Sequence, residues 1–80
     1  MPNPSSYRQA PILVALGSAV RKSRLDRGLS QEELAHLAEV DVSYLGRVER
    51  GDNNVAVMTL AKIARALGTT MADLMSTAQL

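Results

Sequence analysis

The chain has 80 residues, which is enough for one small domain. It has no cysteine and one histidine, which excludes a disulfide scaffold, a thiolate metal site and a metal site built from several histidines. Hydrophobic residues make up 46% and aromatic residues 2%, so we expect a globular domain with an aliphatic core. The net charge of +1 neither requires nor excludes an acidic partner.

The first ten residues, MPNPSSYRQA, are rich in proline and serine. They predict a flexible N-terminal tail at residues 1–10 and a folded domain at residues 11–80. The alternative is that Tyr7 and Arg8 pack back on the domain or contact a partner. The longest apolar stretch, residues 11–16, is too short to cross a bilayer, and the N-terminus lacks the long apolar segment of a signal peptide. We therefore expect a cytoplasmic protein without a membrane partner.

Two helices are expected in the first half of the domain. A proline suits the first turn of a helix, so the first helix begins at residue 11, and it runs to residue 27 before Gly28. Ser30 and Glu33 form an S-x-x-E capping box, which begins a second helix at residues 31–38. Apolar residues recur at helical spacing in both segments. These residues are Ile12, Leu16, Ala19 and Val20, and then Leu34, Leu37 and Ala38.

A third helix is predicted at residues 42–50. Asp41 is a suitable N-cap, Leu45 and Val48 share the buried side, and Gly51 ends the helix. Only residues 39–41 join the second and third helices, which is typical of a helix-turn-helix unit.

Two further helices complete the chain. Apolar residues from Val57 to Leu67 recur at helical spacing until Gly68, and Thr70 then caps a fifth helix. No segment alternates as a strand does. The sequence therefore predicts an all-α domain of five helices.

The segment from Leu29 to Gly51, LSQEELAHLAEVDVSYLGRVERG, resembles the helix-turn-helix of the Cro/C1-type (XRE-like) bacterial and phage regulators. The resemblance continues through LAKIARALG at residues 60–68 and then TTMADLM. It implies a compact lambda-repressor-like domain in a DNA-binding transcriptional regulator encoded by a bacterium or phage. The chain is also similar to the controller proteins of restriction–modification systems, which are small dimers. Glu39 stands where the family's turn usually has glycine, so we expect a shifted or slightly strained turn.

The third helix has a polar face that differs from the side of Leu45 and Val48. In a major groove, Val42 and Ser43 at its start would lie deepest, and Arg47 is the candidate for a bidentate guanine contact. Gly46 would let the DNA backbone approach closely. The expected base-reading residues are Val42, Ser43, Tyr44 and Arg47.

Phosphate contacts are expected from Gln31 at a helix N-terminus, from Arg50, and from Asn53 and Asn54 in a polar turn. Purely structural roles stay open as alternatives. The arginines could be ordinary solvated surface residues, Tyr44 could be a packing residue, and the asparagines could only form the turn.

The resemblance also implies an ion pair between Arg24 and Glu49, which would join the first and third helices. Alternatively, Arg24 is a surface charge that contacts phosphate.

One domain of this size reads only a few base pairs, so we expect a homodimer. Its interface is predicted on the last helix, unless these apolar residues only close the domain's own core. The candidates are Leu67, Met71, Leu74 and Met75.

The sequence thus predicts a regulator that binds a palindromic operator in double-stranded DNA, with RNA polymerase as a candidate further partner. The alternative is an antitoxin-like protein-interaction module with the same fold. We do not expect an enzyme, because Glu32 and Glu33 are adjacent and cannot face each other, and because no nucleophile–base constellation is present. No metal, cofactor or small-molecule ligand is predicted.

Overall fold

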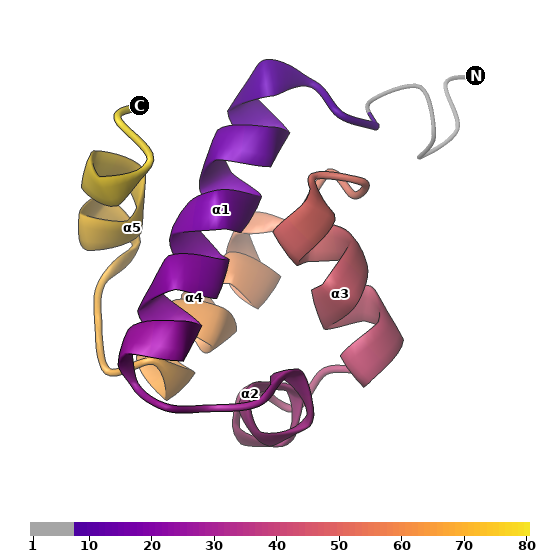
Figure 1. The fold of residues 1–80 in the computed structure, drawn as a ribbon, viewed down its shortest axis with the longest axis vertical. Coiled ribbons are helices and arrows are strands. Elements are labelled where there is room, and N and C mark those ends of the chain that lie inside the picture. The colour runs from indigo at the N-terminus through magenta and orange to yellow at the C-terminus, as the bar shows by residue number, and fades with distance from the viewer. Residues whose placement is uncertain (1–7) are drawn as a thin grey trace.

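The computed structural model describes residues 8–80, which form five helices and no strand (Figure 1). The predicted all-α fold is confirmed, with the first and fourth helices each ending one residue before the expected position. No helix in this range is long and apolar enough to cross a membrane. The helices are α1 Pro11–Asp26, α2 Gln31–Ala38, α3 Val42–Arg50, α4 Val57–Ala66 and α5 Met71–Thr77.

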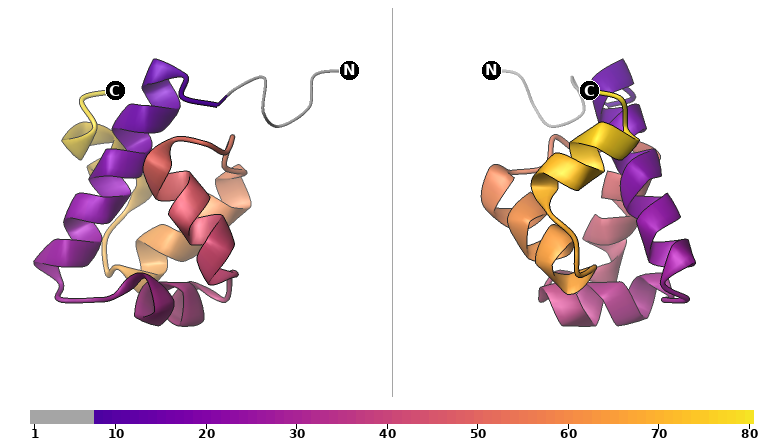
Figure 2. Two further views of the ribbon diagram at one scale, coloured as in Figure 1. Left: turned by 45° about the vertical axis from the view of Figure 1, so that its right-hand side comes forward. Right: turned by 90° about the vertical axis from the view of Figure 1, so that its left-hand side faces the viewer.

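Helix α1 lies between α3 and α5, and α4 lies behind it in Figure 1. Helix α2 crosses one end of this arrangement and contacts both α3 and α4 (Figure 2). The core between the helices is aliphatic, as the composition predicted. Its residues are Leu16, Val20, Leu34, Ala35, Ala38, Leu45, Leu60, Ile63, Ala64, Leu67 and Leu74.

Three helix starts show which caps the sequence could predict. The capping box before α2 is confirmed: Ser30 Oγ accepts the Glu33 N–H at 3.0 Å, and Glu33 Oε1 accepts the Ser30 N–H at 2.8 Å. Thr70 likewise caps α5. The predicted side-chain cap at Asp41 is wrong, because this residue precedes α3 but its side chain accepts no hydrogen bond. The start of α3 is exposed, so water can satisfy its first N–H groups.

The turn between α2 and α3 lies where the sequence predicts it. Glu39 adopts the left-handed conformation with φ 59°, and the N–H of Val40 then bonds to the carbonyl of Ala35 at 3.0 Å. A non-glycine residue in this conformation costs about 1 kcal/mol or more. The turn is therefore strained rather than shifted.

The apolar residues at helical spacing predicted which face of each helix is buried, but not how many residues of that face are buried. Ile12, Leu37 and Val57 belong to these faces, yet each is more than half exposed. Leu37 lies beside Lys62 and Arg65 of α4, yet most of its side chain stays in solvent. Helical spacing shows which residues share a face, whereas burial also depends on where the next helix lies.

The end of the predicted N-terminal tail is attached to the domain. The N–H of Gln9 donates to the carbonyl of Gly51 at 2.7 Å, and its side chain reaches the same loop. Residues 8–10, which we call the N-terminal strap, therefore contact the domain, and the flexibility of the tail stays a prediction. Residues 1–7 of the predicted tail lie outside the described residues.

Candidate nucleic-acid interface

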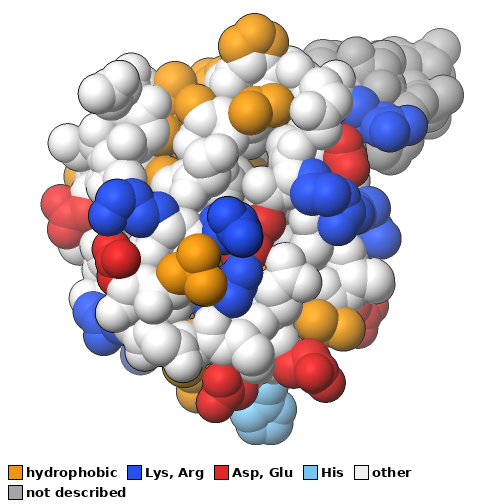
Figure 3. Space-filling view, viewed as in Figure 1, with side chains coloured by type: hydrophobic (Ala, Val, Ile, Leu, Met, Phe, Trp, Pro, Cys, Tyr) orange, Lys and Arg blue, Asp and Glu red, His pale blue; other side chains and the backbone are white. Residues whose placement is uncertain are grey.

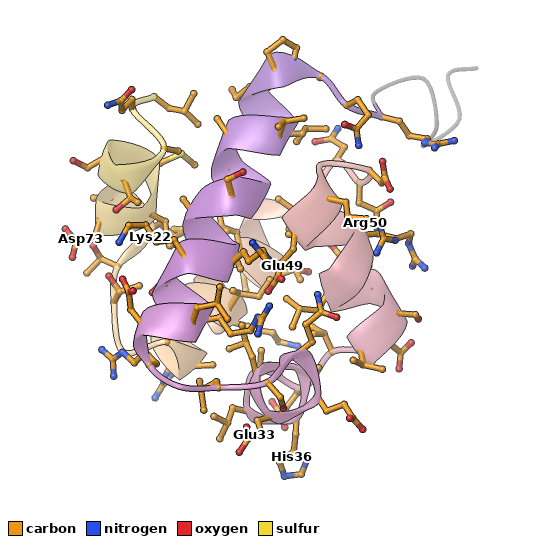
Figure 4. All side chains as sticks on the ribbon, in the orientation of Figure 1. Lys22, Glu33, His36, Glu49, Arg50 and Asp73 are labelled. Carbon is orange, nitrogen blue, oxygen red and sulfur yellow. The ribbon has the colours of Figure 1, made fainter. Side chains whose placement is uncertain are left out.

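Helix α3 places its apolar side against the core and its polar side in solvent. Leu45 and Val48 are buried, whereas Ser43, Arg47 and Arg50 are exposed. Figure 4 shows Arg50 on the outer side of α3 and Glu49 between α1 and α3. The predicted division of α3 into two faces is confirmed, and Val42 at its start is 44% exposed.

Tyr44 and Arg47 lie together on the exposed face. The Arg47 guanidinium carbon is 5.9 Å from the centre of the Tyr44 ring, which is the geometry of a cation–π contact. Tyr44 is half-buried, so it packs against the domain and still presents part of its ring. The contact holds the Arg47 side chain along the helix surface, within reach of a ligand that approaches α3.

The ion pair predicted between Arg24 and Glu49 is present and buried. Arg24 Nε donates to Glu49 Oε2 at 2.7 Å and Nη2 donates to Oε1 at 3.0 Å, so the pair is bidentate. The third nitrogen, Nη1, donates to the carbonyl of Leu29 at 2.9 Å. The hydrogen bond to Glu49 raises the pKa of Arg24 above its already high value, so the guanidinium stays charged. The alternative, in which Arg24 is a surface charge for phosphate, is wrong.

Gln31 joins this network. Its Nε2 donates to Glu49 Oε1 at 3.0 Å, and the side chain is half-buried. We expected the amide as a free donor for phosphate at the start of α2. Instead the side chain satisfies a buried carboxylate, so that α1, α2 and α3 all meet at Glu49. A contact between Gln31 and DNA stays a prediction, with its second amide hydrogen as the available donor.

Gly17 brings the backbones of α1 and α3 together. A Cβ atom at this position would lie 2.2 Å from the carbonyl oxygen of Val48 and 2.7 Å from that of Glu49. Only glycine fits there. This close approach is not among the sequence-based predictions, although a glycine within a helical stretch is the local sign of one.

Gly46 has a different role from the expected one. The place of its missing Cβ is 3.3 Å from Arg50 Nη1 and 3.7 Å from Gln31 Oε1. The space above this glycine is therefore filled by two side chains of the chain itself, not left open for a DNA backbone. Arg50 thus folds back over α3, and its guanidinium lies beside Gly46 and the side chain of Gln31.

The loop after α3 contains the remaining predicted residues and one that was missed. Asn54 is exposed and Asn53 is half-buried, and both stay candidates for phosphate contacts. Asp52 accepts hydrogen bonds from Gln9 Nε2 at 2.6 Å and from Arg50 Nε at 3.2 Å. These two bonds hold the pKa of the Asp52 carboxyl below its usual 3.8. In the sequence, the only sign of these Asp52 contacts is the nearby opposite charge, which does not show which residues pair.

The charged side chains are unevenly distributed over the surface. Figure 3 shows Lys and Arg side chains on the side where α3 and the strap lie, and others over α1 and on the opposite side. Acidic side chains and the single histidine gather over α2, at the lower end of the same view. A chain of net charge +1 thus presents a basic edge beside the exposed face of α3.

The predicted dimer surface is only partly available. Leu67 and Leu74 are buried in the chain's own core, with 0% and 2% exposure, so they cannot contact a second copy. Met71 and Met75 pack against this core and stay partly exposed. The alternative interpretation, that these residues close the domain's core, is correct for the two leucines. The sequence could not separate inner from outer residues on so short a helix.

Comparison with known proteins identifies the family. A family model described as helix-turn-helix matches residues 20–74, which is more than half of the chain. The chain belongs to this helix-turn-helix family. This result confirms the resemblance found in the segment from Leu29 to Gly51.

Several relatives of this helix-turn-helix protein are controller proteins. It is 39% identical over 61 residues to the control protein C.SmaI of Serratia marcescens, covering 76% of this chain and 73% of that protein. The crystal structure of the restriction–modification controller protein C.AhdI from Aeromonas hydrophila superposes with a TM-score of 0.76 and 45% identity, covering 78% of this chain and 94% of that one. The structure of the controller protein C.Esp1396I as a tetramer in complex with its operator has a TM-score of 0.78 and 25% identity, covering 85% and 90%.

Proposed function

We propose that this helix-turn-helix protein is a transcriptional regulator that binds a palindromic operator as a homodimer. In each copy, α3 enters the major groove of double-stranded DNA. The observation that carries the proposal is the exposed polar face of α3, because the opposite face of the same helix is fixed to the core. Its bacterial relatives and the proposed DNA target support a location in the bacterial cytoplasm.

The exposed residues of α3 divide into two groups by their expected contacts. Val42 offers a methyl surface suited to a thymine methyl, Ser43 can donate or accept, and Arg47 can bind guanine through two hydrogen bonds. Arg50 at the far end of α3 and Asn54 in the loop beyond it would bind phosphate oxygens. The first group reads the sequence, whereas the second sets the position of α3.

A dimer is expected because the DNA contact of a single copy is small. One α3 reaches only a few base pairs, and two copies would read half-sites about 34 Å apart. Met71 and Met75 are the residues of the predicted set that still have surface for the contact. The tetrameric state named for C.Esp1396I supports self-association in this family. Sedimentation should therefore show a dimer at about tens of micromolar, and a monomer there would contradict this part of the proposal.

Selection of bound sequences from random duplex DNA tests the proposal most broadly. We expect an enriched palindrome with half-sites one helical turn apart and an affinity that falls steeply with salt. Enrichment of no sequence at low salt would overturn the proposal and favour a protein-interaction module. Pull-down of a protein partner would then be the next experiment.

A pair of arginine variants separates base reading from charge. Arg47→Ala should relax the preference at one base pair, by about 1–3 kcal/mol. Arg65→Ala removes the same charge from an exposed position on α4 and should leave the selected sequence unchanged. An unchanged preference in Arg47→Ala would show that this residue does not read a base.

We also propose that this protein is a regulator rather than an enzyme. RNA polymerase stays a candidate partner.

A further inference from the structure

The N-terminal strap is fastened to the end of α3 by one residue. Gln9 donates its backbone N–H to Gly51 and its side-chain amide to the carbonyl of Arg50 and to Asp52 Oδ1, at distances of 2.6–2.7 Å. Gln9 adopts φ 60°, a conformation that costs a non-glycine residue energy. These hydrogen bonds between segments about 40 residues apart offset that cost. They fix where the residue before Gln9 lies.

That residue is Arg8, and it lies beside the same carboxylate as Arg50. Arg8 Nε is 3.7 Å from Asp52 Oδ1, and Arg50 Nε is 3.2 Å from Asp52 Oδ2. The carboxylate side chain is only 16% exposed, whereas the two arginine side chains are 59% and 61% exposed. Two positive charges and one negative charge leave this group with a net charge of +1. Its shielded centre is negative and its solvent-facing rim is positive.

We propose that Arg8 is a further phosphate-binding residue and that Asp52 positions it beside Arg50, so that both guanidinium groups face one stretch of the DNA backbone. This inference rests on the proposed DNA binding and adds residues that precede the first helix to the interface. Both Asp52 contacts use Nε, which leaves the terminal nitrogens of each arginine available for phosphate oxygens. Arg8 and Arg50 then form a pair of arginines on either side of one carboxylate.

A purely structural strap is the competing explanation. In that case Gln9 fastens the chain, Arg8 is a solvated side chain, and Asp52 only weakens DNA binding by repelling phosphate. The two explanations predict opposite signs for the removal of the Asp52 charge. Positioning predicts weaker binding, because the arginines lose their common anchor, whereas repulsion predicts tighter binding.

The first experiment measures the salt dependence of binding for Arg8→Ala, using the selected duplex and a random-sequence duplex. We expect the slope of log K against log salt concentration to fall by about 1 for each bound copy, on both duplexes. At about 0.1 M salt this corresponds to roughly tenfold weaker binding per copy. Arg8→Lys should restore most of the slope. Arg65→Ala, which removes the same charge elsewhere, should change the slope far less.

The second experiment compares the effect of Asp52→Asn in two backgrounds, the wild type and the Arg8→Ala, Arg50→Ala variant. Asp52→Asn keeps an oxygen that can accept from Gln9 but removes the charge between the arginines. We expect it to weaken binding in the wild-type background and to lose that effect when Arg8 and Arg50 are both alanine. The melting temperature of each variant shows whether the fold is intact, and Asp52→Glu should keep most of the affinity.

The outcomes separate this inference from the proposed function. If the wild type binds the selected duplex but Arg8→Ala leaves the slope unchanged, the inference is wrong and the proposed function stands. Tighter binding by Asp52→Asn in the wild-type background would likewise overturn the positioning role. If the wild type binds neither duplex, the proposed function is wrong and this inference falls with it.

Discussion

Helix α1 is held on its two sides by different kinds of contact. Toward α3 the contact is polar and close, with a buried bidentate ion pair at Arg24 and backbone atoms packed against Gly17. Toward α5 it is apolar, with Leu74 in the core and Met75 packed against it. The polar contact holds the helix with the proposed base-reading face, whereas the apolar contact holds the helix with the proposed dimer surface.

The difference matters because the two kinds of contact constrain orientation differently. Hydrophobic burial is non-directional, and methionine side chains adapt to several arrangements. A bidentate arginine–carboxylate pair fixes both distance and angle. We therefore expect α3 to have one well-defined angle to α1, while α5 can adjust when two copies meet.

Removal of Arg24 should be the most damaging change on the polar side. Arg24→Ala leaves the buried carboxylate of Glu49 with only the amide of Gln31, so the free energy of unfolding should fall by about 3–5 kcal/mol. Chemical denaturation measures this loss. Lys22→Ala breaks an exposed pair with Asp26 and is the matched control, with an expected loss below about 0.5 kcal/mol. Equal losses in the two variants would show that the buried pair contributes nothing special.

On the apolar side, truncation of a core residue should lower the free energy of unfolding by a similar amount, with a wider spread between positions. Leu74→Ala leaves a cavity in the core and should reduce the free energy of unfolding by about 2–5 kcal/mol. Met75→Ala should cost less, because that side chain is already partly exposed. Melting at two protein concentrations separates core from interface. A loss in Leu74→Ala that disappears on dilution would place this residue in the dimer contact instead.

Local chemistry explains what the sequence predicted well. The capping box of Ser30 and Glu33 depends on residues three apart, and the helix ends at Gly28 and Gly51 depend on single residues. These features need no knowledge of distant parts of the chain. The same holds for the two faces of α3, since the spacing of Leu45 and Val48 sets which side is buried.

Contacts between distant segments explain what the sequence missed. Gln9 binds the loop after α3 across more than 40 residues, and no local pattern indicates that partner. The ion pair of Arg24 and Glu49 was expected only because of the family resemblance. Leu67 and Leu74 were assigned to the dimer surface because spacing cannot show which apolar residues the neighbouring helices cover.

Two glycine variants sharpen the contrast at the backbone. Gly17→Ala places a Cβ against the carbonyl of Val48, so the free energy of unfolding should fall by about 1–3 kcal/mol despite the better helix propensity of alanine. Gly46→Ala meets only the flexible ends of Arg50 and Gln31 and should be neutral or stabilising by up to about 1 kcal/mol. Equal stability of the two variants in thermal melts would contradict the close packing of α1 on α3.

The smallest effect concerns acid stability at the start of α2. Hydrogen bonds from Ser30 hold the pKa of Glu33 below its usual 4.5 in the folded state. A lowered pKa stabilises the folded protein above the unfolded value, and this contribution is lost as pH falls through the folded value. Melting temperatures of the wild type and Glu33→Gln should therefore keep a constant difference above about pH 4.5 and converge below it. Parallel curves at all pH values would show that this carboxylate does not contribute.

The most direct test of the central claim uses a variant that keeps the fold but loses the directional contact. Arg24→Met combined with Glu49→Leu replaces the ion pair by apolar side chains, an exchange that is often neutral or stabilising. The quantity to measure is the affinity for the selected duplex divided by that for a random duplex. If the polar contact sets the angle of α3, the variant melts near the wild-type temperature and its affinity ratio falls about tenfold. A folded variant with an unchanged ratio would contradict the account.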